Sequence, residues 1–300
     1  MSEETRAGFV ALIGAPNAGK STLLNALVGA KVSIVTHKVQ TTRVPVRGIA
    51  MAGKTQIVFV DTPGIFAPKR RLDRAMVGSA WQGATDADLV ALLIDAQRGL
   101  DDENRTIIGK LTEVRQPKIL ILNKIDTVAR DSLLALTAAA NEAIQFERTF
   151  MISATNGDGV SDVRDYFAGK MPKGPFLYPE DEISDVPMRL MAAEITREKL
   201  YLRLHEELPY QSTVETDSWE ERKDGSVRIE QTIYVERDGQ KKIVLGQGGK
   251  MVKSISMDAR KEISKEIEKK VHLFLHVKVR EGWGDDPERY RGIGLEFPRE

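Results

Sequence analysis

Runs of apolar residues recur along the first half of the chain at the length of buried β-strands. Stretches with helical periodicity, such as Ser132 to Ala143, separate most of these runs. Strands that alternate with helices predict an α/β fold, a mainly parallel sheet with helices on both faces. Ala52 and Gly53 join the second and third runs as a hairpin turn would, so one strand is expected to be antiparallel. The six runs are Phe9–Ile13, Val44–Met51, Lys54–Val60, Leu89–Asp95, Lys118–Leu122 and Thr149–Ser153.

This alternation ends near residue 171. From Met171 to Pro187 the chain carries several prolines and the acidic run Glu180-Asp181-Glu182, which is typical of a linker between domains. A helical stretch, two alternating strand-like stretches, another helical stretch and a strand follow. They lie at Met188 to Glu207, Ser212–Trp219, Ser226–Glu236, Met251 to Lys270 and His272–Val279. We therefore predict a first domain over residues 1–173, a linker over residues 174–187 and a second, α+β domain over residues 188–300.

A glycine-rich segment directly follows the first strand-like run. It reads GAPNAGKST, which fits the phosphate-loop pattern GxxxxGK[ST] between a strand and a helix. Glycines let backbone N–H groups turn toward an anion, Lys20 reaches the terminal phosphates, and the helix that begins near Ser21 directs its positive dipole end at the nucleotide. The segment therefore predicts binding of a nucleoside triphosphate. The predicted phosphate-binding residues are Gly14, Ala15, Pro16, Asn17, Ala18, Gly19, Lys20, Ser21 and Thr22.

The element Asn123-Lys124-Ile125-Asp126 indicates which base is bound. The Asp126 carboxylate can accept hydrogen bonds from the ring N–H and the exocyclic amine of guanine, which adenine does not offer. Asn123 can join the base site to the phosphate loop, and the stem of Lys124 can cover the face of the base. The backbone at Ser153-Ala154, after the last strand-like run, is expected to meet guanine O6. These positions favour GTP, so a phosphate-loop kinase or ATPase is disfavoured.

Two further segments are expected to bind Mg²⁺ and the γ-phosphate. Asp61-Thr62-Pro63-Gly64 follows the third apolar run, so the Asp61 carboxylate can hold Mg²⁺ through water and Gly64 can donate its N–H to the γ-phosphate. Ser21 supplies a hydroxyl to the same ion. Gln40-Thr41-Thr42-Arg43 lies in the interval where a switch threonine is needed. We favour Thr42 as the contact to Mg²⁺, because Thr41 is equally well explained as the start of the following strand.

Together these motifs resemble the superclass of GTPases that includes translation factors and ribosome-assembly proteins. Ile65 follows Gly64 where Ras-type enzymes carry a glutamine that orients the attacking water, and an isoleucine cannot do this. GTPases with a hydrophobic residue here tend to be slow, and some recruit potassium with an asparagine at the position of Asn17. The resemblance makes Asn17 a candidate K⁺ ligand. The alternative is that asparagine here only tolerates an unusual backbone conformation.

A second glycine-rich loop lies between two helical patterns of the second domain. Gly246-Gln247-Gly248-Gly249 has the GxxG spacing, and the order helix, strand, strand, helix, GxxG, helix, strand matches a type II KH fold. Such a loop lets an RNA backbone approach, while neighbouring apolar positions receive unstacked bases. The second domain is thus predicted to bind RNA.

Charge is divided sharply along the chain, although its formal net charge is +0. Residues 180–236 hold 15 acidic and 7 basic side chains, a net of −8, whereas residues 237–280 hold 12 basic and 5 acidic ones, a net of +7. The basic part coincides with the GxxG loop, which indicates contacts to phosphates. The predicted RNA-binding residues are Lys241, Lys242, Gly246, Gln247, Gly248, Gly249, Lys250, Lys253 and Arg260.

The combination of a guanine-nucleotide domain, a linker and a type II KH domain resembles the bacterial Era GTPase family over nearly the whole chain. The resemblance implies GTP and GDP as ligands, Mg²⁺-dependent hydrolysis and binding near the 3′ end of small-subunit (16S) rRNA. It further implies a role in 30S ribosomal subunit assembly and peripheral association with the inner membrane. We expect the protein to be a monomer. Within the GxxG loop, Gln247-Gly248 is less charged than the pair usual in the family. The matching segments are Gln40-Thr41-Thr42-Arg43, Asp61-Thr62-Pro63-Gly64, Gly239-Gln240-Lys241-Lys242, and Gly282-Trp283 followed by Asp285-Asp286.

The composition of the chain excludes several classes of protein and site. The chain has 300 residues, which suits about two domains, and no cysteine, so disulfides and thiolate metal sites are excluded. No apolar stretch approaches the roughly 18 residues of a membrane-spanning helix, and the polar start MSEETRAGF is unlike a signal peptide, so we expect a cytoplasmic protein.

One other function stays open, a membrane-associated signalling GTPase whose C-terminal domain binds protein or anionic lipid.

Overall fold

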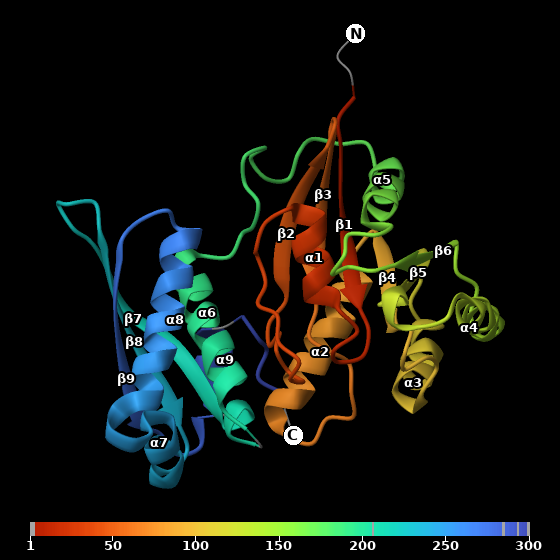
Figure 1. Ribbon diagram of the computed structural model, residues 1–300. Helices are drawn as coiled ribbons and strands as arrows, with labels where there is room; N and C mark the ends of the chain where they lie inside the picture. Colours follow the sequence, from red (N-terminus) through yellow and green to blue (C-terminus); the bar gives the residue numbers. More distant parts are fainter. Residues whose placement is uncertain (1–3, 206, 284–285, 293, 299–300) are drawn as a thin grey trace. The chain divides into compact units, whose positions relative to one another are not determined.

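The structure is a computed structural model that describes residues 4–205, 207–283, 286–292 and 294–298. Contacts group the chain into two compact units, whose elements are labelled in Figure 1. Over the described residues, the first unit comprises Met1–Ser33, Val39–Asp185 and Ile293–Glu300, and the second comprises Ile34–Lys38 and Val186–Gly292. Each unit is therefore assembled from segments that are separated in the sequence.

A six-stranded sheet forms the centre of the first unit. Its strands are β1 (Arg6–Ile13), β2 (Val46–Ala52), β3 (Thr55–Asp61), β4 (Leu89–Asp95), β5 (Lys118–Asn123) and β6 (Arg148–Ile152). They lie in the order β2-β3-β1-β4-β5-β6 (Figure 1). Of these strands only β2 runs antiparallel, because a hairpin turn at Gly53 and Lys54 joins it to β3. The predicted mainly parallel sheet is confirmed, with the turn one residue later than expected.

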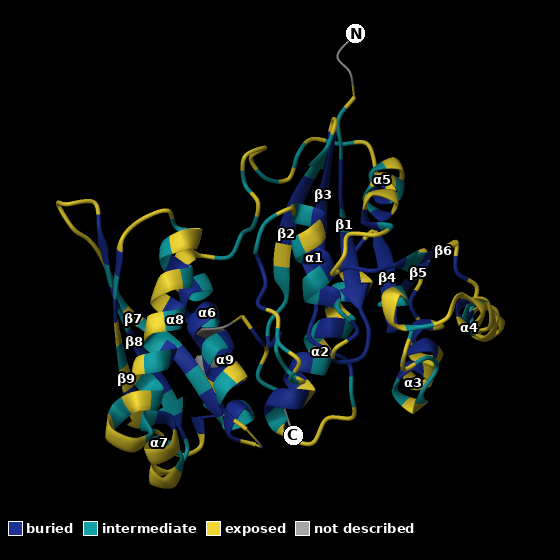
Figure 2. Ribbon diagram, in the orientation of Figure 1, coloured by how far each residue is buried: buried dark blue, intermediate teal, exposed yellow. Residues whose placement is uncertain are grey.

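Helices cover both faces of this sheet. α1 and α5 pack on one face against Val10 and Leu12 of β1, and α2, α3 and α4 pack on the other against Ala11 and Ile13. Successive side chains of a strand point to opposite faces, so the apolar run of β1 contributes to both cores. Figure 2 shows the strands of this sheet largely buried. The bounds are α1 (Lys20–Val28), α2 (Arg71–Asp86), η1 (Ile125–Thr127), α3 (Asp102–Leu111), α4 (Arg130–Ala143) and α5 (Val160–Lys170).

The segment predicted as a linker is held along the edge of this sheet. The side chain of Gln56 in β3 is fully buried, and its Oε1 accepts from the N–H groups of Leu177 and Tyr178 at 2.8 and 3.0 Å. Its Nε2 donates to the Tyr178 carbonyl at 2.8 Å. Farther on, the Ile49 N–H donates to the carbonyl of Ile183 at 2.9 Å. The chain up to residue 185 is therefore ordered as part of the first unit.

A three-stranded sheet with helices packed on it forms the second unit. Its elements are α6 (Met188–Arg203), η2 (Leu208–Gln211), β7 (Ser212–Glu221), β8 (Val227–Val235), α7 (Asp238–Leu245), η3 (Gln247–Gly249), α8 (Lys250–Glu266), β9 (Val271–Val279) and α9 (Pro287–Gly292). β7 pairs antiparallel with β8, and β8 pairs parallel with β9. This mixed sheet and element order confirm the predicted KH-type arrangement.

Two helices of this unit end earlier than the periodicity predicted. α6 stops at Arg203, because Leu204 takes extended backbone angles (φ −94°, ψ 153°) and its side chain is buried. α8 stops at Glu266, and Glu268 follows with a positive φ of 52°. Asp285, part of the family resemblance, lies outside the described residues.

Candidate nucleotide site and GxxG surface

The phosphate loop lies between the end of β1 and the start of α1. Gly14 has φ 150° and Gly19 has φ 96°, and both angles suit glycine. A Cβ on Gly14 would overlap the Leu93 carbonyl, and one on Gly19 would overlap the Asn123 side chain. Asn17 also has a positive φ, 63°. The loop backbone can therefore approach a ligand closely, as the motif predicted.

Lys20 places a buried ammonium in the middle of this loop. Its Nζ donates to the carbonyls of Gly14 and Ala15 at 3.1 and 3.0 Å. Burial lowers the pKa of Lys20 from 10.5 to about 8, while the nearby Asp61 carboxylate opposes this by raising it. A cation desolvated in this way is poised to bind an anionic phosphate.

Hydroxyl groups from three segments converge on the Asp61 carboxylate. The Ser21 Oγ donates to Asp61 Oδ2 at 2.6 Å, and the Thr42 Oγ1 lies 3.0 Å from Ser21 Oγ and 3.3 Å from Asp61 Oδ2. Ser33 Oγ also donates to Asp61 Oδ2, at 2.9 Å. Ser33 belongs to no motif, so the sequence could not single it out.

This oxygen cluster, made by Ser21, Ser33, Thr42 and Asp61, suits a divalent cation. Asp61 is fully buried, and burial raises its pKa. Its Oδ1 has no hydrogen-bond partner among the described residues. Mg²⁺ prefers such oxygen ligands and binds through one or two carboxylates. Ser21, Thr42 and Asp61 are therefore the residues that would hold Mg²⁺, the arrangement expected from the motifs.

The residues after Asp61 fix the loop but leave no side chain for activating water. The Thr62 Oγ1 donates to the Leu12 carbonyl at 2.8 Å, and a Cβ on Gly64 would lie 2.9 Å from the Cα of Pro16. Ile65 is 6% exposed and packs in the core beneath α2, and its N–H donates to the Gly14 carbonyl at 3.1 Å. Hydrolysis here cannot use a side chain at position 65.

Asn123 connects the base side of the site to the phosphate loop. Its Nδ2 donates to the Ala18 carbonyl at 2.9 Å, and its Oδ1 accepts from the Ala154 N–H at 3.0 Å. The Ala154 N–H, which was expected to meet guanine O6, is thus already engaged by Asn123. Asp126 is exposed in η1, with its carboxylate accessible to a base. Ser153, beside Ala154, is buried.

Lys124 is held by a carboxylate that the sequence motifs do not include. It has φ 64°, and its Nζ pairs with Asp95 Oδ2 at 2.6 Å. Asp95 ends β4 beside β5 and is 6% exposed. Because the carboxyl ends of parallel strands meet at one sheet edge, Asp95 orients the Lys124 stem at the base site.

The GxxG loop joins α7 to α8 in the second unit. Gly246, Gly248 and Gly249 have φ of 70°, 59° and 76°. A Cβ on Gly246 would lie 2.7 Å from that of Met251, whereas one on Gly248 would meet nothing within 4 Å. The outer glycine thus leaves open space where a nucleic-acid backbone can approach. Around the loop, Lys242, Lys250, Lys253 and Arg260 are exposed, Lys241 is half-buried and Gln247 is exposed.

A groove of about 300 Å³ lies between α8 and β9, next to the predicted RNA-binding lysines. Met257 and Phe274 line it and are 52% and 44% exposed, so two large apolar side chains are open to solvent in the same groove. Arg228 lies over the Phe274 ring at 5.0 Å. Exposed aromatic and apolar groups beside basic ones suit stacked bases. The sequence did not indicate Met257 of α8 or Phe274 of β9, because the pattern of a helix or strand does not reveal which of its faces lacks a cover.

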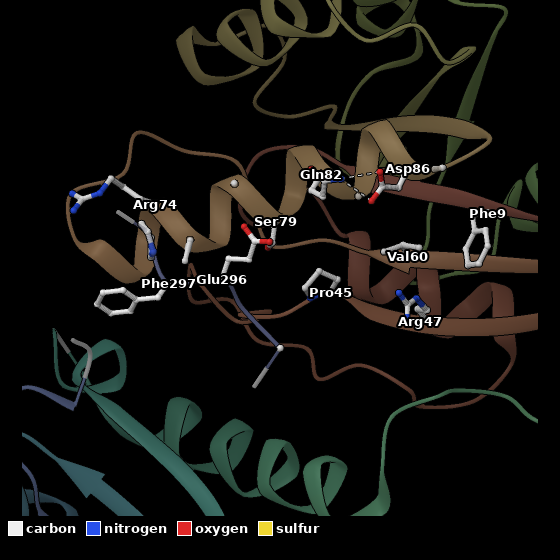
Figure 3. A pocket seen from close by; sticks show the side chains of 16 residues that line it. Phe9, Pro45, Arg47, Val60, Arg74, Ser79, Gln82, Asp86, Glu296 and Phe297 are labelled. Atoms are coloured by element: carbon white, nitrogen blue, oxygen red, sulfur yellow. Dashed lines mark hydrogen bonds between the residues drawn. The ribbon is translucent and has the colours of Figure 1, made fainter. Parts of the chain in front are cut away.

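The first unit also has a cavity of about 890 Å³ that is separate from the nucleotide motifs (Figure 3). α2, the β2–β3 edge and residues 294–298 line it. Arg71 lies 4.9 Å from the centre of the Phe297 ring, and Leu295 is buried. The described C-terminal residues therefore pack against α2.

The fold and both sites define a phosphate-loop GTPase joined to a KH domain. A family model described as 50S ribosome-binding GTPase matches residues 9–124, and one described as KH domain matches residues 207–284. The chain is 69% identical over 295 residues to GTPase Era of Sinorhizobium medicae, across 98% of this chain and 95% of that protein. It is 68% identical to GTPase Era of Rhizobium meliloti, across 98% and 94%. The chain belongs to the Era GTPase family.

Solved structures agree with this assignment. A crystal structure of Era in complex with MgGDPNP and nucleotides 1506–1542 of 16S ribosomal RNA has a TM-score of 0.92 at 35% identity, covering 97% of this chain and 99% of that one. A variant of Aquifex aeolicus Era bound to GDP·AlF4⁻ gives the same values. No helix in the described part of this chain is long and apolar enough to cross a bilayer.

Proposed function

We propose that this GTPase binds the 3′ region of small-subunit (16S) rRNA through its GxxG surface and acts, as a monomer, in 30S ribosomal subunit assembly. One observation supports this most strongly: the fold matches, over 97% of the chain, an Era structure that holds nucleotides 1506–1542 of 16S rRNA together with MgGDPNP. The second unit of this chain has the features such a ligand needs. Lysines surround an open glycine loop, and an apolar groove runs beside it.

The RNA site is tested by placing negative charge on the loop. Gln247→Asp with Gly248→Asp is expected to weaken binding of a 16S 3′-end fragment at least tenfold and to make its salt dependence shallower, because phosphate contacts are lost. GTP affinity is expected to stay nearly unchanged. A matched control, Lys265→Gln with Lys269→Gln, lowers the net charge by the same amount at exposed positions in the last turn of α8 and just beyond it, and is expected to bind RNA nearly as well as the wild type.

The same titration separates the proposal from the alternative function. The proposal places the protein in the cytoplasm with peripheral contact to the inner membrane. Fluorescent RNA and anionic vesicles are titrated in parallel at matched ionic strength. If the wild-type chain binds vesicles tightly and the RNA fragment no better than an unrelated RNA, the chain is a membrane-associated GTPase and the RNA proposal is wrong.

We further propose that Asn17 binds K⁺ and that this ion supports hydrolysis in place of a side chain at position 65. Mg²⁺, when bound, neutralises charge on the transferred phosphate. Asn17 lies in the phosphate loop, and Ile65 is buried in the core. An additional cation is therefore a reasonable source of the missing stabilisation.

This ion proposal predicts faster GTP turnover in KCl than in NaCl of equal ionic strength. Asn17→Gly is the informative variant, because glycine keeps the positive φ without strain and removes only the amide. It is expected to abolish the difference between the two salts, whereas Asn17→Asp, which keeps an oxygen ligand, is expected to preserve it. Equal wild-type rates in both salts would refute the K⁺ role.

A further inference from the structure

Residues 34–38, here called the switch segment, belong to the second unit although both ends of the segment lead to the nucleotide site. Ser33 directly precedes the segment and donates to Asp61 at 2.9 Å. Thr42 follows it after a few residues and lies 3.3 Å from the same carboxylate. The chain thus leaves the oxygen cluster, contributes to the second unit and returns to the oxygen cluster.

A buried carboxylate holds the switch segment. The Val35 N–H donates to Oε1 of Glu198 in α6 at 2.9 Å. Glu198 is only 4% exposed, and Ile34 beside Val35 is buried as well. Val35 itself is 41% exposed, so the bond is partly buried. A charged acceptor that bonds a backbone N–H still makes a strong and directional interaction. A fold rarely buries a carboxylate unless its oxygens are satisfied, so this contact defines where the segment lies.

We propose that Glu198 is a positioning residue for GTP hydrolysis and acts on the oxygen cluster through Val35. Only Ile34 separates Val35 from Ser33, and an extended chain spans at most about 3.6 Å per residue. A displacement of several ångströms at Val35 must therefore reach Ser33 or be absorbed by the residues before Thr42. Without the Glu198 bond, the segment gains conformations in which Ser33 and Thr42 leave Asp61, and fewer molecules have the site assembled.

The other oxygen of Glu198 connects this contact to the C-terminal half of α8, the helix that follows the GxxG loop. Its Oε2 pairs with Lys199 at 2.7 Å, and Lys199 also pairs with Glu262 of α8. α8 begins directly after the GxxG loop and carries the exposed Arg260. This step rests on the proposed function: an RNA bound at α8 would influence the switch segment through Lys199 and Glu198.

The positioning role is tested without RNA, in the full-length chain, by comparing Glu198→Ala with Glu198→Gln. Glutamine keeps an acceptor for the Val35 N–H, whereas alanine does not. We expect Glu198→Ala to lower the single-turnover rate of GTP hydrolysis about tenfold, with GDP affinity within about twofold of the wild type. Glu198→Gln is expected to retain most of the rate. A merely structural role would instead lower the melting temperature and GDP affinity and leave the rate of the folded fraction unchanged.

A second variant approaches the same hydrogen bond from the other side, in case Glu198→Ala folds poorly. An ester oxygen in place of the Val35 N–H removes the donor and leaves every side chain intact. It is expected to slow hydrolysis to a similar extent, and combining it with Glu198→Ala is expected to add little, because both remove one interaction. A wild-type rate in the ester variant, or losses that add fully, would overturn the proposal.

The link to RNA has its own readout. Lys199→Met interrupts the path to Glu262, and we expect it to reduce the change in hydrolysis rate that a 16S 3′-end fragment causes in the wild type. An unchanged response overturns the Lys199 step. If the fragment does not bind the wild-type chain, the proposed function fails, while the comparison of Glu198 variants without RNA still decides the positioning role.

Discussion

Burial lowers the pKa of Lys20, so the charge of this side chain changes within a pH range that can be reached in stability and binding measurements. The pKa of Lys20 is about 8 in the folded chain and 10.5 is the reference value for the unfolded chain, so the two states differ in protonation between these pH values. Below about pH 8 Lys20 is protonated in both states. Between about 8 and 10.5 the unfolded chain binds the extra proton, so this residue makes the free energy of unfolding rise with pH across that window.

Nucleotide binding is expected to restore this proton. The phosphates favour the charged form of Lys20, so GDP binding near pH 9 should take up protons, whereas binding near pH 7 should take up few through this group. Titration calorimetry in two buffers of different ionisation enthalpy measures the uptake at each pH. The same proton uptake at both pH values would contradict the lowered pKa of Lys20.

The site residues that could be predicted from the sequence belong to motifs whose members lie only a few positions apart. Lys20 and Ser21 follow from one motif, and Thr42 lies in the interval where a switch threonine is needed, next to a Thr41 that is equally well explained as the start of the following strand. Ser33, Asp95 and Glu198 could not be predicted from the sequence. Each contacts a residue that is far away in the sequence, and a serine or an acidic residue alone does not indicate its partner. Only the fold brings these groups to the motifs.

At the scale of elements, Gln56 determines how the linker lies. It is the buried polar residue of β3 that bonds three backbone groups of Leu177 and Tyr178. The prolines and acidic side chains of residues 174–187 predicted a linker. They did not predict that the linker is bound to β3, because a glutamine in a strand gives no sign of its partner. Strands were predicted well because apolar runs long enough to be buried leave few alternatives, whereas helix ends depended on local backbone angles such as those of Leu204.

Gln56→Leu is expected to release the linker while leaving the sheet folded. Leucine fills the space but leaves three backbone groups of the linker without partners, each worth about 1 kcal/mol or more. Hydrogen exchange of the Leu177 and Tyr178 amides should become faster, and limited proteolysis should cut near them sooner. Leu177→Ala, at an exposed side chain, is the matched control and should change neither rate much. Unchanged exchange in Gln56→Leu would mean that other contacts hold the linker.

At the scale of the whole molecule, the uneven charge of the chain has a structural counterpart. The basic residues 237–280 lie entirely in the second unit, where the GxxG loop and the groove beside α8 are found. The sequence could predict this arrangement because charge, glycine spacing and element order all pointed to the same segment. It could not predict that residues 34–38 belong to the second unit, because the sequence of a short loop next to a nucleotide motif does not indicate which of the two units the loop packs on.

The assignment of residues 34–38 and 294–298 means that neither unit is complete as a continuous piece of chain. A cut after residue 185 yields an N-terminal fragment that contains Val35 but lacks Glu198. The C-terminal fragment contains Phe297 but lacks Arg71, whose guanidinium lies over the Phe297 ring. Kinetic constants measured on an isolated N-terminal fragment would therefore describe a GTPase whose switch has lost its anchor.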